Sequence, residues 1–121
     1  LIILLDQFTR NIYRDNPRAF SGDEMALALS LRCLDRGYLG DADANQRHFM
    51  LMPLMHSEDL AIQDMSLPLF EIHTNAQTLD YAQRHRDIIA HFGRFPHRNA
   101  ILGRPSSSEE TEFLTQPGSS F

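Results

Sequence analysis

The chain of 121 residues contains no lysine, because all eleven of its basic residues are arginine. A P-loop, a Schiff base and a lysine general base each need an ammonium group, so these chemistries are excluded. The bias has two interpretations. A coding preference for arginine explains it without any function, whereas the planar guanidinium also suits recognition of carboxylates and phosphates.

Cysteine is nearly absent as well, with Cys33 as the single example. No internal disulfide and no multi-cysteine metal site can therefore form, and a reducing cytoplasm fits this composition. A long apolar run is also missing, since the initial LIILL is about a quarter of the length that a bilayer requires. We expect no membrane span, and no signal peptide is visible. Because the chain starts in this apolar run without methionine, we interpret it as a fragment that lacks N-terminal helices.

Charge and composition narrow the class further. The net charge of -5 argues against nonspecific binding to nucleic acid, which depends on neutralising phosphates. With 42% hydrophobic and 22% charged residues, the chain has the composition of a globular protein and the length for one core. No stretch alternates convincingly with period two. We therefore predict a single all-α domain over residues 1–121.

Apolar side chains recur at three- and four-residue spacing along most of the chain, which predicts a series of helices. They are expected at residues 1–14, 22–36, 41 or 43 to 53, 57 to about 72, 77–92, 96–102 and 107–115. In the second helix the predicted core-facing stripe consists of Met25, Leu27, Ala28, Leu31 and Leu34. Pro68 lies inside the fourth helix, where we expect a kink or a break.

Capping residues mark the predicted helix ends. The expected N-caps are Ser21 or Asp23, Asp41 or Asp43, Ser57, Asn75 or Thr78, and Ser107 in a capping box with Glu110. The expected stops are Gly37, Gly93 and Gly103.

The densest set of polar side chains lies in residues 80–104, DYAQRHRDIIAHFGRFPHRNAILGR. Within this segment the turn GRFPHRN, residues 93–99, lies between two predicted helices. Free backbone N–H groups at a helix start favour an anion, and Arg94, His97 and Arg98 add charged donors. A phosphate or carboxylate site is one interpretation. The alternative is that these arginines bind helix carbonyls and nearby acids such as Asp87.

Several histidines and acids carry weaker signals. His85 lies on an apolar helix face, so it is either buried with a partner or placed for proton transfer. Asp87 and His91 are four residues apart, a spacing that can chelate a metal, although an exposed ion pair explains it better. We expect no metal site and no cofactor.

The segment LMHSED, residues 54–59, combines His56 with Ser57, Glu58 and Asp59. A serine nucleophile is conceivable there, but helix capping explains Ser57 better, and no G-x-S-x-G turn occurs.

A second basic wall is conceivable near the start of the chain. Asp6, Arg10 and Arg14 lie four residues apart along one face of the first predicted helix. The simpler interpretation is a salt bridge between Asp6 and Arg10 with further surface charges, worth less than about 1 kcal/mol if exposed.

The segments LDQFTRNIYR, PLMHSEDL, RHRDIIAHFGRFPHRNAILGR and EFLTQPGSSF occur in this order, and together they resemble family 924 of the bacterial domains of unknown function. The resemblance covers essentially the whole chain. It implies a tetratricopeptide-like fold of antiparallel helix pairs in an α-α superhelix, although no repeat is visible in the sequence. It also implies that residues 1–121 are the C-terminal two-thirds of a larger family domain.

The resemblance carries over polar motifs rather than an activity. The residues that we expect to bind a ligand are Asp6, Arg10, Asn11, His56, Arg94, His97, Arg98 and Asn99. Our first hypothesis is a cytoplasmic helical protein that binds a small anionic ligand or a peptide carboxylate in a cleft of arginine and histidine. A protein-interaction scaffold of tetratricopeptide type is the first alternative. A hydrolase is the second, with catalytic candidates His85, His97, Glu58 and Asp59, so the sequence leaves open whether the protein is an enzyme.

Overall fold

The computed structural model describes residues 2, 9–12, 14, 16–20, 22–117 and 119. All regular elements in this part of the chain are α- or 3-10 helices, with no strand among them. The predicted all-α class is therefore confirmed. The elements are α1 (Thr9–Ile12), η2 (Pro17–Phe20), α2 (Asp23–Asp35), η3 (Tyr38–Asp41), α3 (Ala44–Met55), α4 (Leu60–His73), α5 (Ala76–Phe92), η4 (Pro96–Arg98), α6 (Asn99–Leu102) and α7 (Ser108–Phe113).

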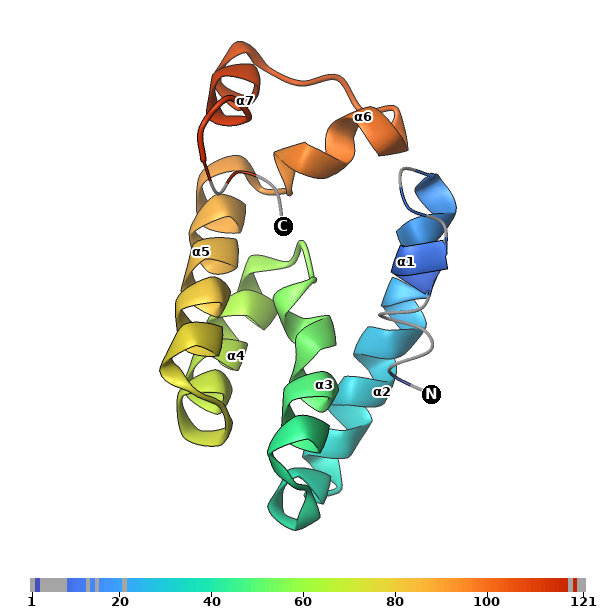
Figure 1. Ribbon diagram of the computed structural model, residues 1–121, viewed down its shortest axis with the longest axis vertical. Helices are drawn as coiled ribbons and strands as arrows, with labels where there is room; N and C mark the ends of the chain where they lie inside the picture. Colours follow the sequence, from blue (N-terminus) through green and yellow to red (C-terminus); the bar gives the residue numbers. More distant parts are fainter. Residues whose placement is uncertain are drawn as a thin grey trace.

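Consecutive long helices pack side by side (Figure 1). Helix α2 lies against α3, α3 against α4, and α4 against α5. Only residues 56–59 separate α3 from α4, and residues 74–75 separate α4 from α5, so these neighbours run antiparallel. A tetratricopeptide-like superhelix stays a prediction. After α5 the chain turns across the end of the long helices through η4 and α6, and α7 returns toward α5 (Figure 1).

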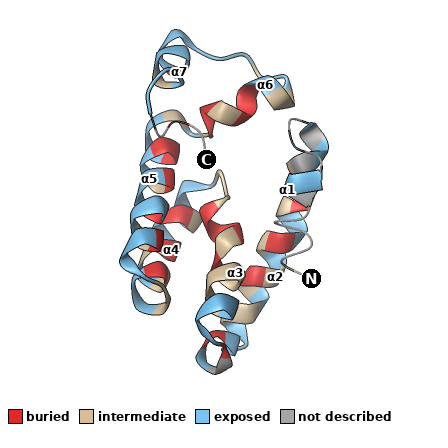
Figure 2. Cartoon of the chain, in the orientation of Figure 1, coloured by how far each residue is buried: buried red, intermediate tan, exposed pale blue. Residues whose placement is uncertain are grey.

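The main core lies between α3, α4 and α5, where the buried residues in Figure 2 line the inward faces. Leu51, Leu54, Phe70 and Ala82 are almost completely buried there. A second cluster joins the end of α5 to the following turn and consists of Ile88, Ile89 and Phe95, with Phe92 and Phe113 against it. This second cluster supports the polar segment 93–99.

The predicted stripe of α2 is only partly correct. Leu27, Leu31 and Leu34 do pack against the core, but Met25 is 60% exposed and Ala28 is exposed. The fully buried positions are instead Ala26 and Ser30, and the Ser30 hydroxyl donates to the Met50 carbonyl of α3. Small side chains at these positions let α2 approach α3 closely.

The helix starts confirm some predicted caps and correct others. Asp43 caps α3 in a capping box with Gln46. The prediction of Asp23 for α2 is wrong, because Gly22 holds the N-cap position without a side-chain hydrogen bond, and Ser21 lies outside the described residues. Ser57 is not the cap of α4. Asp59 is, since its carboxylate accepts from the Ala61 N–H at 2.9 Å.

Two prolines are accommodated inside helices. Helix α3 does not end at Pro53 but continues to Met55, and Pro53 is buried. Helix α4 continues through Pro68 to His73, so the helix is not interrupted there. The missing hydrogen bond at each proline costs stability, which the tertiary packing of these helices offsets.

Most helix ends in the second half of the chain lie where the sequence predicted them. Asn75 caps α5 by accepting from the Thr78 N–H at 2.8 Å. Gly93 and Gly103 end α5 and α6 with φ of 74° and 68°, the left-handed region that glycine tolerates. Ser107 and Glu110 form the predicted capping box, although α7 itself covers only Ser108–Phe113. Gly37 likewise follows α2 with φ of 71°.

Of the predicted helix over residues 1–14, α1 is the main described part, and most of its other positions lie outside the described residues. Within the ranges that the structure describes, no helix is both long enough and apolar enough to cross a membrane.

Candidate ligand-binding site

Glu58 joins two distant segments of the chain. It lies in the short connection between α3 and α4, and its carboxylate accepts from the Phe95 backbone N–H at 2.6 Å. The same carboxylate forms two bonds with the Arg104 guanidinium, at 3.0 Å and 3.2 Å. Burial alone would raise the pKa of Glu58, but the hydrogen bonds from Arg104 and Phe95, with the positive charges of Arg98 and Arg104, outweigh it and lower this pKa below 4.5. Glu58 is therefore ionised and fixes the turn at residues 93–99 against the α3–α4 connection.

Arg98 is the buried cation of this region, with 7% of its surface exposed. Its guanidinium lies over the Phe20 and Phe95 rings, 4.5 Å and 4.7 Å from their centroids. One Nη donates to the His56 carbonyl at 3.0 Å, and the other lies 3.9 Å from an Asp23 carboxylate oxygen. Because aromatic rings and a carbonyl hold it, the guanidinium plane has a fixed orientation.

Arg98 and His56 border a cavity of about 210 Å³. The cavity lies between the start of α2, the end of α3 and the connection to α4. The other residues that line it are Asp23, Glu24, Leu27, Pro53, Ser57 and Glu58. Three carboxylates thus share the walls with the guanidinium, and one of them, Glu58, already pairs with Arg104.

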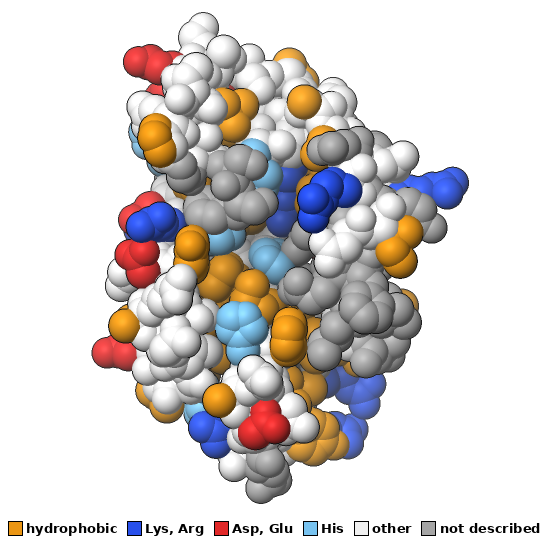
Figure 3. All heavy atoms as spheres, viewed as in Figure 1, with side chains coloured by type: hydrophobic (Ala, Val, Ile, Leu, Met, Phe, Trp, Pro, Cys, Tyr) orange, Lys and Arg blue, Asp and Glu red, His pale blue; other side chains and the backbone are white. Residues whose placement is uncertain are grey.

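Histidines from three segments gather beside Arg98. The ring centroids of His85 and His97 lie 5.5 Å and 5.6 Å from that of Phe95, and those of His56 and His85 are 6.3 Å apart. Figure 3 shows histidine side chains in the middle of one face of the molecule, close to arginine. The α3–α4 connection, α5 and the 93–99 turn therefore meet at one place.

His85 is buried, and its Nδ1 lies 2.7 Å from the Tyr81 carbonyl. Burial, together with the nearby His56, His97 and Arg98, lowers the pKa of His85 from 6.5 to about 4, against the opposing effect of the Tyr81 carbonyl. The ring is neutral at pH 7, so Nδ1 carries the hydrogen and donates to that carbonyl. This geometry matches the buried, paired histidine that the sequence allowed.

A second ion-pair network lies around Glu110 of α7. Arg94 donates to both of its carboxylate oxygens, at 2.8 Å and 3.0 Å, and Asn99 donates to one of them at 3.0 Å. The Ser107 N–H donates to the same carboxylate at 3.0 Å. The hydrogen bonds from Arg94 and Ser107 hold the pKa of Glu110 far below its usual range. Arg94 therefore binds an acid as the structural interpretation expected, but that acid is Glu110 and not Asp87.

The remaining predicted site residues have different surroundings. Asn11 is exposed on α1, Asp6 lies outside the described residues, and nothing is described of the Arg10 side chain. Asp59 is occupied as the cap of α4. Their roles in binding or catalysis stay predictions.

The i, i+4 pair of Asp87 and His91 does not form the exposed ion pair that the sequence favoured. His91 contacts Glu109 of α7, with 2.5 Å between Nε2 and Oε1, and Asp87 contacts Arg86 at 3.4 Å. Among the described residues, no group of three or more potential ligands could hold a metal ion.

Sequence reasoning missed two partners that organise the site. Arg104 was visible at the end of the polar segment 80–104, yet nothing local indicated that it would pair with Glu58, 46 residues away. Glu110 was predicted only as a capping residue. Its additional bonds to Arg94 and Asn99 depend on how α7 folds back over the 93–99 turn.

Fold and site together define an all-α protein whose loops at one end are joined by partly buried ion pairs beside a small cavity. A family model described as "Bacterial protein of unknown function (DUF924)" matches residues 1–118, and the chain belongs to this family. The resemblance in the sequence motifs is thereby confirmed.

A solved structure from Agrobacterium tumefaciens, "Structure of Protein of Unknown Function ATU0120", is similar to this chain, with a TM-score of 0.88 and 36% sequence identity. The match covers 93% of this chain and 64% of that one, so the chain spans less than two-thirds of that protein's length. No curated protein matches.

Proposed function

We propose that this protein binds a small ligand with one carboxylate or phosphate group in the cavity beside Arg98. The supporting observation is that a buried, orientationally fixed guanidinium and His56 border the same 210 Å³ cavity. A planar guanidinium suits bidentate recognition of such groups, and a low-dielectric surrounding strengthens the charge-assisted hydrogen bonds. His97 adds a further polar ring beside Phe95.

The acids on the cavity walls restrict the ligand. Asp23 and Glu24 line the cavity together with Arg98, so a ligand with several negative charges would be repelled. A carboxylate or a singly charged phosphate is favoured. A ligand that also carries an ammonium group could use both signs of charge. Free amino acids and short peptides belong to this class, whereas polyphosphates and nucleic acids do not. We place this function in the cytoplasm, for which the single Cys33 is suitable.

The set of proposed binding residues is smaller than the set that the sequence suggested. Arg94 and Asn99 are engaged by Glu110, and displacing that carboxylate would cost its network of hydrogen bonds. Arg98 and His56, which line the cavity, remain as the proposed binding residues, and His97 lies close to them beside Phe95. Glu58 acts indirectly, since it positions the turn that carries Arg98.

The hydrolase alternative receives less support from the same geometry. A general acid or base works best with a pKa near the operating pH. Glu58 is held ionised by Arg104, and burial lowers the pKa of His85 to about 4, so neither group is suited to exchange a proton near pH 7.

The test is a thermal-shift screen with inorganic phosphate, monocarboxylates, free amino acids and short peptides, followed by calorimetry of any compound that binds. A ligand at about a hundred times its dissociation constant adds about 2.7 kcal/mol, which raises Tm by about 10 °C for a domain of this size. Arg98→Gln and His56→Asn should each weaken binding. The second variant keeps the main-chain carbonyl that Arg98 uses.

Arg84→Gln is the matched control, because Arg84 is an exposed arginine of α5 that pairs with Asp80. It should leave ligand binding unchanged. The proposal is wrong if no compound of these classes shifts Tm, or if a shift survives both Arg98→Gln and His56→Asn.

A further inference from the structure

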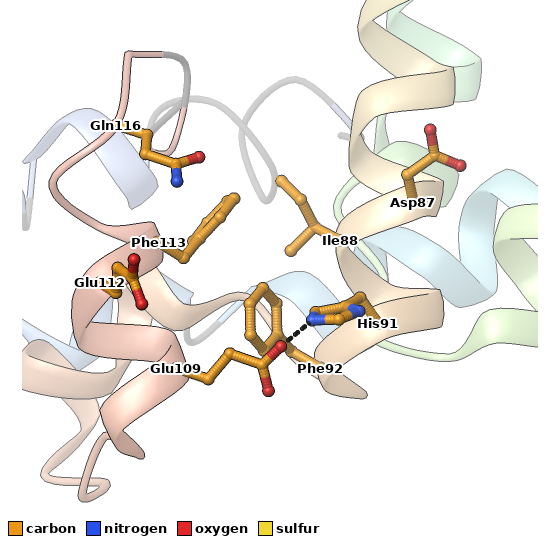
Figure 4. A pocket seen from close by; sticks show the side chains of 8 residues that line it. All are labelled: Asp87, Ile88, His91, Phe92, Glu109, Glu112, Phe113 and Gln116. Carbon is orange, nitrogen blue, oxygen red and sulfur yellow. Dashed lines mark hydrogen bonds and ion pairs between the residues drawn. The ribbon is translucent and has the colours of Figure 1, made fainter.

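A second, larger hollow lies between α5 and α7, and its volume is about 420 Å³ (Figure 4). This groove is distinct from the cavity beside Arg98, since the two share no lining residue. The side chains that line it are Asp87, Ile88, His91, Phe92, Glu109, Glu112, Phe113 and Gln116. Its volume is within the range of about 300–1,000 Å³ that is typical of ligand pockets.

The floor of the groove is apolar and aromatic. Figure 4 shows Ile88, Phe92 and Phe113 facing one another across the space between α5 and α7. The rings of Phe92 and Phe113 are inclined at 54° with their centroids 5.0 Å apart. These side chains belong to the second core cluster, so the floor is supported from beneath. A preformed surface of this kind accepts a large apolar side chain at little ordering cost.

The rim of the groove is acidic. The carboxylates of Asp87, Glu109 and Glu112 line it, and none of the described lining residues is arginine. The side chains of Asp87 and Glu109 are 73% and 68% exposed, so both are accessible to a partner, although Glu109 also contacts His91 of the same groove at 2.5 Å. The nearby Arg86 pairs with Asp64 at 2.7 Å and reaches Asp87 only at 3.4 Å. The groove therefore presents a negative potential around an apolar floor.

This charge selects among possible partners. Nucleic acids and anionic membrane surfaces carry phosphates, which three carboxylates would repel, in line with the net charge of -5. A basic segment of another protein is complementary in both respects, since its arginine or lysine side chains can pair with the rim while an apolar residue fills the floor.

We propose that the α5–α7 groove docks a basic segment of a partner protein, with one or two large apolar side chains as anchors. This proposal is independent of the ligand proposed for the cavity beside Arg98. Binding is expected to weaken as salt rises from about 50 to about 500 mM, because the paired charges are exposed.

The test is selection from a library of short random peptides on the immobilised protein, followed by fluorescence anisotropy with the selected peptides. The expected peptides combine arginine or lysine with an aromatic or large aliphatic residue. The double variant Glu109→Arg and Glu112→Arg should weaken their binding about tenfold, through lost attraction and added repulsion. Far-UV circular dichroism of the variant verifies that the helices are intact.

Glu71→Arg is the matched control, because Glu71 is an exposed acid on α4 that does not line the groove. It makes a charge change of the same kind and should leave the affinity for the selected peptides within about twofold of the wild-type value. The single variant Glu112→Gln should give an intermediate loss. Failure to select any peptide, selection of peptides without basic residues, or binding that the double reversal leaves unchanged would each overturn the proposal.

Discussion

Glu58→Gln should destabilise the protein by about 2 kcal/mol. The carboxylate accepts three hydrogen bonds, two of them from Arg104, and its side chain is 26% exposed. A hydrogen bond to a charged group contributes about 1.5–3 kcal/mol, and partial exposure favours the lower part of that range. Glutamine keeps the volume and one acceptor for Phe95 but loses the charge that Arg104 pairs with. For a domain of this size the loss corresponds to about 8 °C in Tm.

Urea unfolding followed by circular dichroism measures this loss, and a double-mutant cycle with Arg104→Gln assigns it. Because the two side chains contact each other directly, their coupling energy should be about 1 kcal/mol or more. Glu71→Gln, an exposed change on α4, should stay within about 0.5 kcal/mol of the wild type. If Glu58→Gln is as stable as this control, or if the cycle shows no coupling, the ion pair does not hold the two segments together.

The pH dependence follows from the same carboxylate. The folded pKa of Glu58 is lower than 4.5, its ordinary value, so the unfolded state binds more protons as the pH falls through that region. The stabilisation is fully present above about pH 4.5 and is lost as the pH falls through the folded pKa. In Glu58→Gln the stability should therefore decline less steeply in acid than in the wild type.

Three further predictions concern the surrounding residues. Glu110→Gln should cost about 3 kcal/mol in urea unfolding, because it removes the buried charge that Arg94 and Asn99 bind. His85 should titrate in NMR near pH 4, far below 6.5. Because the pKa of His85 is lower in the folded state than in the unfolded state, its contribution to stability is full above pH 6.5. That contribution is lost as the pH falls toward 4, by about 3 kcal/mol in total. A titration midpoint near 6.5 would contradict its burial. Gly93→Ala should cost about 1 kcal/mol from backbone strain alone, since φ is 74° and a Cβ there would meet nothing within 4 Å; an unchanged Tm would show that this turn relaxes.

Local signals made part of the fold predictable. The cap at Asn75, the capping box of Ser107 with Glu110 and the stop at Gly93 each depend on residues a few positions apart, and all three were correct. Their hydrogen bonds form within one helical turn, so the sequence contains everything that decides them.

Tertiary packing explains why some predictions from the sequence were wrong. Pro53 lies within α3, where its ring is buried and lines the cavity beside Arg98. Met25 was expected in the core as part of a periodic apolar stripe, but Ala26 and Ser30 are buried in its place where α2 comes close to α3. A periodic pattern reveals an apolar face but not how closely the neighbouring helix approaches it.

The candidate site shows the same division. The sequence singled out the polar segments 54–59 and 93–99, because their charged residues are concentrated in turns, and the structure brings these two segments into contact. Which arginine binds which acid could not be predicted, since Glu58 and Arg104 are 46 residues apart and Arg94 and Glu110 are 16 apart. Such pairs form only when the helices have brought the segments together.

The arginines of residues 93–104 therefore have two physical roles, which measurements of stability and of ligand affinity can separate. Arg94 and Arg104 each grip a carboxylate with two hydrogen bonds, so an incoming anion would have to displace a bidentate partner. Arg98 is held differently, by two aromatic rings and a carbonyl, with Asp23 at 3.9 Å, and it borders the cavity. Arg104→Gln should therefore lower the free energy of unfolding by more than it changes the free energy of ligand binding to the folded protein. Arg98→Gln should weaken ligand binding to the folded protein even after correction for any loss of stability. Equal effects of both variants on affinity would mean that the two roles are not separate.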